Sequence, residues 1–108
     1  MESDHRKFDE EQIDLLCEAF AAIQNKEECM SFLEDLMTIR EIQDMTQRLY
    51  VAKLLREGKA YQAVMEKVSV SSATISRVNR CLNYGAGGYR LILDRIVPDN
   101  DKGTEGES

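Results

Sequence analysis

Three times in the first half of the chain, a short polar residue stands three positions before a glutamate or glutamine, and an apolar stripe with helical spacing follows. The pairs are Asp9 with Gln12, Asn25 with Glu28, and Thr38 with Glu41. This spacing is typical of helix starts, because the first side chain can accept from backbone N–H groups left unbonded in the first turn. The pattern predicts three helices, the first ending near residue 23, the second reaching beyond residue 33 and the third ending near residue 57, where Gly58 is a suitable stop.

After Gly58 the predicted elements are shorter. Helical patterns cover about residues 60–68, 72–82 and 89–97, and a glycine-rich break at residues 84–88 separates the last two. The only proline is Pro98, and no segment alternates apolar and polar residues as a half-buried strand would. We predict an all-α fold of about six helices, forming one domain over residues 1–97. The acidic tail, residues 98–108, has no apolar residue and is predicted to be disordered.

The composition excludes several classes of protein. Hydrophobic residues make up 43% and charged residues 31%, a balance typical of a soluble globular domain. No segment approaches the roughly 20 apolar residues that span a bilayer, and the charged start of the chain is unlike a signal peptide. Three isolated cysteines (Cys17, Cys29, Cys81) and one histidine, His5, predict neither a disulfide framework nor a metal site. We expect reduced thiols packed as small hydrophobic side chains, in the cytoplasm.

Residues 61–80 have the apolar spacing of a helix-turn-helix. Such a unit needs apolar side chains where its two short helices pack together, and polar ones where the second helix faces DNA. Apolar residues fill all five inner positions, namely Val64, Val68, Val70, Ile75 and Val78. Two positions depart from the usual pattern, with Ser69 where glycine is common in the turn and Met65 where a small residue is usual. We predict a helix-turn-helix over about residues 60–82.

The surface between these inner positions is polar, and it ends in arginines. Its members are Ser71, Ser72, Ala73, Thr74, Ser76, Arg77, Asn79 and Arg80. Short hydroxyl side chains at a helix start let the backbone approach DNA, and arginine and asparagine can form paired hydrogen bonds with guanine and adenine respectively. The alternative is an ordinary helical hairpin whose serines only cap a helix and contact water.

Charge is unevenly distributed along the chain. Taken alone, the formal net charge of -6 argues against binding to nucleic acid, whose phosphates repel acidic proteins. Residues 1–38, however, carry a net charge of -8, residues 39–96 carry +5, and residues 97–108 carry -3. The predicted helix-turn-helix therefore lies in the basic part of the chain.

Over about residues 32–93 the sequence resembles the tryptophan-repressor superfamily. The similarity is strongest in LLREG at 54–58 and ATISR at 73–77, and residues 72–89 resemble in particular the small bacterial Trp repressor-like proteins of the YerC/YecD group. The resemblance implies an intertwined two-fold homodimer with two helix-turn-helix heads. The terminal helices are also richer in large apolar residues than a compact monomer of 108 residues readily hides. A monomer with a self-contained core remains the alternative.

The resemblance also implies residue roles. DNA contacts in the family come from the end of the first motif helix and the start of the second, which here carry Gln62, Ser71, Ser72, Ala73, Thr74, Ser76 and Arg80. The family's tryptophan ligand lies between two arginines, one matching Arg77 and the other within one residue of Arg48. Cys81 replaces a serine near the ligand ammonium and is a poorer partner. We therefore do not expect tryptophan as the ligand; another small-molecule effector remains open, and no cofactor is predicted.

These observations predict a sequence-specific regulator of transcription that binds double-stranded DNA, most simply a dimeric repressor that blocks a promoter at a palindrome-like operator. The alternative is a helical protein-interaction module without specific DNA binding, in which the acidic first helices bind the partner. An enzyme is not predicted, because the sequence has no nucleophile–base constellation, phosphate loop or metal-ligand cluster.

Overall fold

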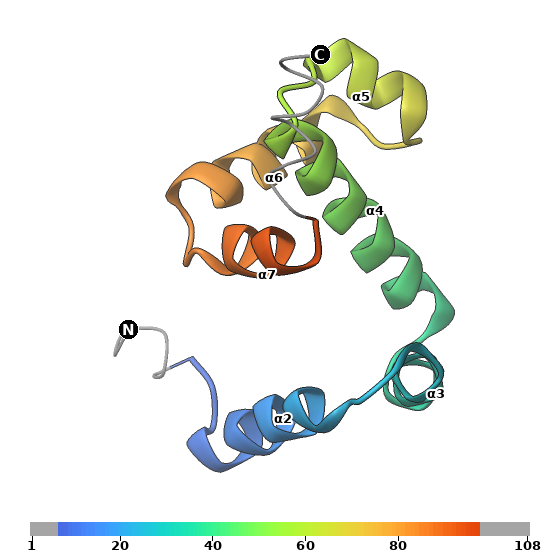
Figure 1. The fold of residues 1–108 in the computed structure, drawn as a ribbon, viewed down its shortest axis with the longest axis vertical. Coiled ribbons are helices and arrows are strands. Elements are labelled where there is room, and N and C mark those ends of the chain that lie inside the picture. The colour runs from blue at the N-terminus through green and yellow to red at the C-terminus, as the bar shows by residue number, and fades with distance from the viewer. Residues whose placement is uncertain (1–6, 98–108) are drawn as a thin grey trace. The chain divides into compact units, whose positions relative to one another are not determined.

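The computed structural model describes residues 7–97, and this part of the chain is helical with no strand (Figure 1). The helices are α2 (Glu10–Ala22), α3 (Lys26–Leu36), α4 (Ile39–Arg56), α5 (Tyr61–Lys67), α6 (Ser72–Tyr84) and α7 (Gly88–Ile96). The predicted all-α fold of about six helices is thus confirmed. None of these helices is both long and apolar enough to cross a membrane. The tail predicted to be disordered, residues 98–108, lies outside the described residues.

Two of the predicted helix starts are visible as hydrogen-bonded caps. The Asp9 carboxylate accepts from the backbone N–H of Gln12 at 3.1 Å, and the Asn25 side chain accepts from that of Glu28 at 2.8 Å. The Glu28 carboxylate in turn accepts from the backbone N–H of Gln24 at 2.9 Å. Each cap satisfies N–H groups that the first helical turn leaves unbonded, which explains why local sequence located these starts correctly.

The chain divides into two compact units, residues 1–39 and residues 40–108. In the described part of the first unit, Phe20 of α2 and Phe32 of α3 meet edge to face, with ring centroids 5.5 Å apart. Neither helix has a buried residue. Cys17 is accordingly exposed in this chain, and the expectation that it packs against apolar side chains of the same chain is not met, because no described residue of α2 or α3 is buried.

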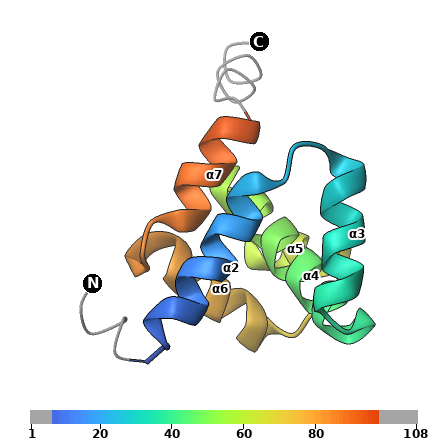
Figure 2. The same ribbon diagram turned by 90° about the horizontal axis from the view of Figure 1, so that it is seen from below.

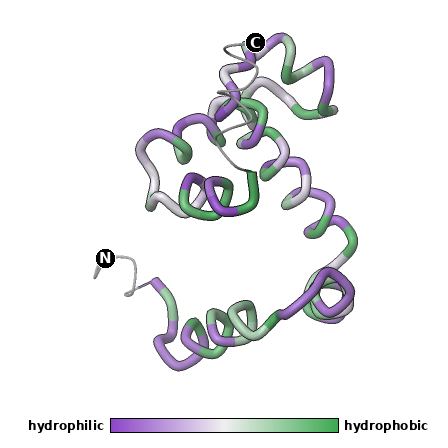
Figure 3. Tube along the Cα trace, viewed as in Figure 1, coloured by the Kyte–Doolittle hydropathy of each residue, from purple (hydrophilic) through white to green (hydrophobic). Residues whose placement is uncertain are grey.

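The core of the described residues lies in the second unit and draws on all four of its helices. It consists of Val51, Ala52 and Leu54 from α4, Val64 from α5, Val68 after it, Ile75 and Val78 from α6, and Leu93 from α7. Figure 3 shows apolar and polar positions alternating along α4, as a helix with one buried face requires. The buried positions of α5 and α6 are therefore part of the same cluster that holds α4 and α7.

Two glycines set where helices end. After α4, the N–H of Gly58 donates to the carbonyl of Leu55 and that of Lys59 donates to Leu54, and Gly58 has a φ of 89°. This bond pair is the Schellman ending, which favours glycine. Helix α6 runs to Tyr84, two residues beyond the predicted end, and closes where the N–H of Gly85 donates to the carbonyl of Cys81. A short loop then leads into α7, which packs against α6 (Figure 2).

Candidate nucleic-acid interface

Helices α5 and α6 pack together as the predicted helix-turn-helix requires. Val64 and Ile75 are fully buried, Val78 and Val68 nearly so, and Val70 in the turn is partly buried against the same cluster. The five inner positions predicted from the sequence are thus confirmed as core positions. Their burial leaves the rest of α6 to face outwards, because helical periodicity places residues between them on other faces.

A serine cap starts α6. The Ser71 hydroxyl accepts from the backbone N–H of Thr74 at 3.1 Å and donates to the Thr74 hydroxyl at 3.2 Å. Ser71 therefore has the capping role that the alternative interpretation gave to the serines. Ser72, the next residue, lies exposed in the first turn of α6.

The other predicted DNA-contacting residues lie on the outside of this unit. Gln62 of α5 and Ser71, Ser72, Ala73, Ser76, Arg77 and Arg80 around α6 are exposed, whereas Thr74 and Asn79 are partly buried. Helical periodicity places Ala73, Ser76 and Arg80 opposite the buried stripe that contains Ile75 and Val78. The result is an exposed helical surface whose groups are short side chains and two guanidinium groups.

Two arginines fasten α7 to the rest of the unit. From α4, the Arg56 guanidinium donates to the Asp94 carboxylate at 2.8 and 3.1 Å and to the backbone carbonyl of Val97 at 3.1 Å. From α7, Arg90 donates to the backbone carbonyl of Leu82 at 3.1 Å and to the side-chain oxygen of Asn83 at 3.0 Å. The two bonds of Arg90 connect α7 directly to the C-terminal part of α6.

The residues predicted to hold a ligand are only partly brought together. Burial raises the pKa of the Tyr89 phenol above its ordinary value, and the charge of Cys81 adds to the increase. The positive charge of the Arg48 guanidinium and a hydrogen bond from it lower the pKa and offset part of the increase. Arg48 and Cys81 therefore lie around Tyr89, and no described contact joins Arg77 to them. Cys81 is exposed, so the expectation that it packs in the core is wrong.

A hollow of about 520 Å³ lies beside Tyr89. It is lined mainly by apolar groups and by the glycine-rich loop, namely Leu49, Cys81, Gly85, Ala86, Gly87, Gly88, Tyr89 and Ile92. Sequence reasoning missed Tyr89 as a member of this site, because it counted Tyr89 only as the start of the last helix. The glycine-rich loop directly before it was the available signal.

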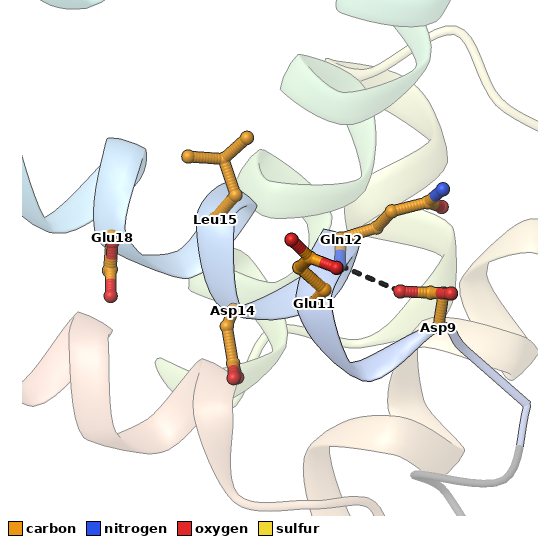
Figure 4. A pocket seen from close by; sticks show the side chains of 6 residues that line it. All are labelled: Asp9, Glu11, Gln12, Asp14, Leu15 and Glu18. Carbon is orange, nitrogen blue, oxygen red and sulfur yellow. Dashed lines mark hydrogen bonds between the residues drawn. The ribbon is translucent and has the colours of Figure 1, made fainter.

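The acidic part of the chain forms a different kind of surface. Along α2, Asp9, Glu11, Asp14 and Glu18 line a hollow of about 600 Å³ together with Gln12 and Leu15 (Figure 4). Within residues 7–97, no group of three or more histidine, cysteine or acidic side chains could hold a metal ion. An array of carboxylates repels phosphate, so the acidic helix is not a candidate for contact with DNA.

Comparisons with known proteins place these features in a family. Residues 11–97 match the family model of the Trp repressor protein. The chain is 46% identical over 97 residues to the protein YerC of Bacillus subtilis (strain 168), an alignment that covers 90% of this chain and 88% of YerC.

Two solved structures are also similar. A TrpR-like protein from Eubacterium eligens ATCC 27750 superposes with a TM-score of 0.76 and 43% identity, covering 80% of this chain and 89% of that one. A candidate Trp repressor from Staphylococcus aureus does so with a TM-score of 0.80 and 41% identity, covering 85% and 92%. Because the matching family consists of transcription regulators, the prediction that the chain is not an enzyme is confirmed. By its sequence and its fold, the chain belongs to the Trp repressor family.

Proposed function

We propose that the protein is a sequence-specific regulator of transcription that binds double-stranded DNA as a homodimer through its helix-turn-helix, and that it represses by occupying an operator. One observation carries the proposal. Helix α6 buries Ile75 and Val78 in the core while it holds Ser72, Ser76 and Arg80 on its exposed side. This division of one short helix into a packed face and a face of hydrogen-bond donors is what major-groove recognition requires.

The charge distribution supports the same function. The net charge of +5 over residues 39–96 favours association with the phosphate backbone, and the net charge of -8 over residues 1–38 opposes it. Binding through residues 39–96 therefore uses the part of the chain whose net charge attracts phosphate. A regulator of this kind acts where chromosomal DNA is, in the cytoplasm.

The exposed apolar residues of the first unit support a dimer. Leu15 is 66% exposed and Ile39 75% exposed, and neither α2 nor α3 buries any residue. Two short helices without a core gain too little hydrophobic stabilisation to offset the entropy of ordering them. A second copy of the chain supplies the missing apolar surface, and two-fold symmetry then sets two helix-turn-helix heads about one DNA turn, roughly 34 Å, apart on a palindrome-like operator.

Selection of bound duplexes from a random pool tests the proposal. We expect a two-fold symmetric motif to be enriched, and sedimentation of the free protein to give the mass of two chains. Arg80→Ala should weaken binding to every duplex and reduce the magnitude of the salt dependence by about one phosphate contact. Arg95→Ala is the matched control, because Arg95 is an exposed arginine of α7 outside the helix-turn-helix.

The alternative function, a helical protein-interaction module, makes the opposite prediction. Its acidic α2 and α3 would bind a partner, and the selection would enrich no motif. If a variant of the acidic unit lost binding to a protein partner while Arg80→Ala had no effect on that binding, the result would favour this module and contradict the proposed function.

A further inference from the structure

A chain of three polar side chains connects α7 to a partly buried residue of α6. Arg90 donates from Nη2 to Oδ1 of Asn83 at 3.0 Å. The Nδ2 of Asn83 then donates to the Oδ1 of Asn79 at 3.1 Å and to its backbone carbonyl at 3.0 Å. Arg90 is itself held by a second bond, from Nε to the carbonyl of Leu82 at 3.1 Å.

Donor and acceptor chemistry allows only one direction for this chain. A guanidinium can only donate, so the atom of Asn83 that faces Arg90 must be its oxygen. The Asn83 amide nitrogen is therefore directed at Asn79, where the backbone carbonyl can only accept. Asn79 must then turn its own side-chain oxygen towards Asn83, and this directs the Nδ2 of Asn79 away from Asn83.

We propose that Arg90 is a positioning residue that sets the polarity of Asn79 at the DNA interface, so that Asn79 presents its amide N–H groups to the duplex. The inference rests on the proposed function, since it names how one residue of the same surface is used. No described residue accepts a hydrogen bond from Nδ2 of Asn79, whereas Oδ1 already accepts one.

The consequence is a preference for acceptors on the DNA. Asparagine reads adenine by accepting with Oδ1 and donating with Nδ2 at once, and the engagement of Oδ1 with Asn83 disfavours that pairing. The partner of Asn79 is instead a hydrogen-bond acceptor, either a base-edge acceptor such as O6 or N7 of guanine or O4 of thymine, or a phosphate oxygen. From the sequence, an asparagine here is expected to pair with adenine. The inference replaces that pairing with a hydrogen bond from Nδ2 of Asn79 to an acceptor on the DNA.

The first test needs no DNA. In the free protein, Arg90→Ala should shift the side-chain amide NMR signals of Asn79 and Asn83, because the bond that orients both is lost. Arg95→Ala removes the same charge from the same helix and should leave those signals unchanged. Unchanged signals in Arg90→Ala would overturn the inference.

The second test is a double-mutant cycle on the selected duplex. We expect Arg90→Ala to reduce affinity or base preference about two- to tenfold, the range for one hydrogen bond, and to have no such effect in an Asn79→Ala background. A change confined to one base pair identifies an acceptor on a base, and a uniform loss across duplexes identifies a phosphate. Additive losses in the double variant would show that Arg90 does not act through Asn79 and would overturn the inference.

A third variant keeps the inference testable if Arg90→Ala does not fold correctly. Asn83→Asp keeps an acceptor for Arg90 but removes the donor to Asn79, so Asn79 should turn its N–H groups inwards and present Oδ1 to the duplex. Where Asn79 contacts a base, the preference should then move towards adenine or cytosine, which offer amino donors. Where Asn79 contacts a phosphate oxygen, affinity should fall for every duplex, because Oδ1 would then face another acceptor. A variant that changes neither base preference nor affinity would overturn the inference while leaving the proposed function intact, whereas a wild-type protein that enriches no duplex motif overturns both.

Discussion

The glycine-rich loop before α7 allows a test in which three neighbouring glycines give different outcomes. At Gly85, a Cβ would lie 2.5 Å from the carbonyl oxygen of Cys81, closer than real contacts allow. Relieving that clash moves the backbone and weakens the bond from the Gly85 N–H to the same oxygen, now 2.9 Å long. Overpacking costs about 1–3 kcal/mol and a lost hydrogen bond about 1 kcal/mol. Gly85→Ala should therefore destabilise the protein by about 2–4 kcal/mol.

The two glycines that follow provide graded controls. Gly87 has a φ of 90°, so Gly87→Ala should cost about 1–2 kcal/mol through backbone strain. Gly88 has nothing within 4 Å of an added Cβ and no positive φ. Gly88→Ala should be neutral or stabilise by up to about 1 kcal/mol, because alanine restricts the unfolded chain.

The assay is denaturant unfolding followed by circular dichroism. Protein concentration must be held fixed, because the stability of the proposed dimer would depend on it. The order of stability should be Gly88→Ala, then wild type, Gly87→Ala and Gly85→Ala. If Gly88→Ala destabilised the protein as much as Gly85→Ala, the steric reasoning would be refuted.

Two further predictions concern the attachment of α7. Arg56→Met keeps an apolar stem but loses the bonds to Asp94 and to the Val97 carbonyl, and should lower the free energy of unfolding by about 1–3 kcal/mol, whereas Arg95→Ala should change it by less than about 0.5 kcal/mol. Because burial raises the pKa of Tyr89 above its ordinary value of 10.0, the folded state retains the phenol proton longer than the unfolded state, so stability should fall as pH rises above about 10. Tyr89→Phe should make that decline shallower in unfolding curves measured between about pH 9 and pH 11, and an unchanged slope would contradict the assigned burial.

Local sequence signals predicted the helices and the buried positions of α5 and α6 well. The caps at Asp9 and Asn25 depend on residues three positions away, and the inner positions such as Val64 and Ile75 follow from helical periodicity within one motif. Such signals need no knowledge of distant parts of the chain. Family resemblance in residues 72–89 then indicated the family that the comparisons confirmed.

The contacts that hold α7 could not be predicted in the same way. Arg56 meets Asp94 across 38 positions, and Arg90 meets Leu82 only because the loop at residues 85–87 turns the chain back on α6. Arg48 and Tyr89 likewise belong to different helices. Each of these pairs depends on the path of the backbone between its members, and composition and spacing carry no information on that path.

The core of the second unit has one further consequence, for the thermodynamics of binding. Five of its eight fully or nearly fully buried members (Val51, Val64, Val68, Ile75 and Val78) are branched at Cβ. Four of the five, all except Val68, lie in helices, where such side chains have essentially one favoured χ1 rotamer, so they have little rotational freedom left to lose when the folded protein binds a partner. For the proposed function, this means that the α5–α6 unit keeps its shape without DNA. The entropy of the proposed DNA binding is then set by ordering of exposed side chains and release of counterions, and the fold itself contributes little to it.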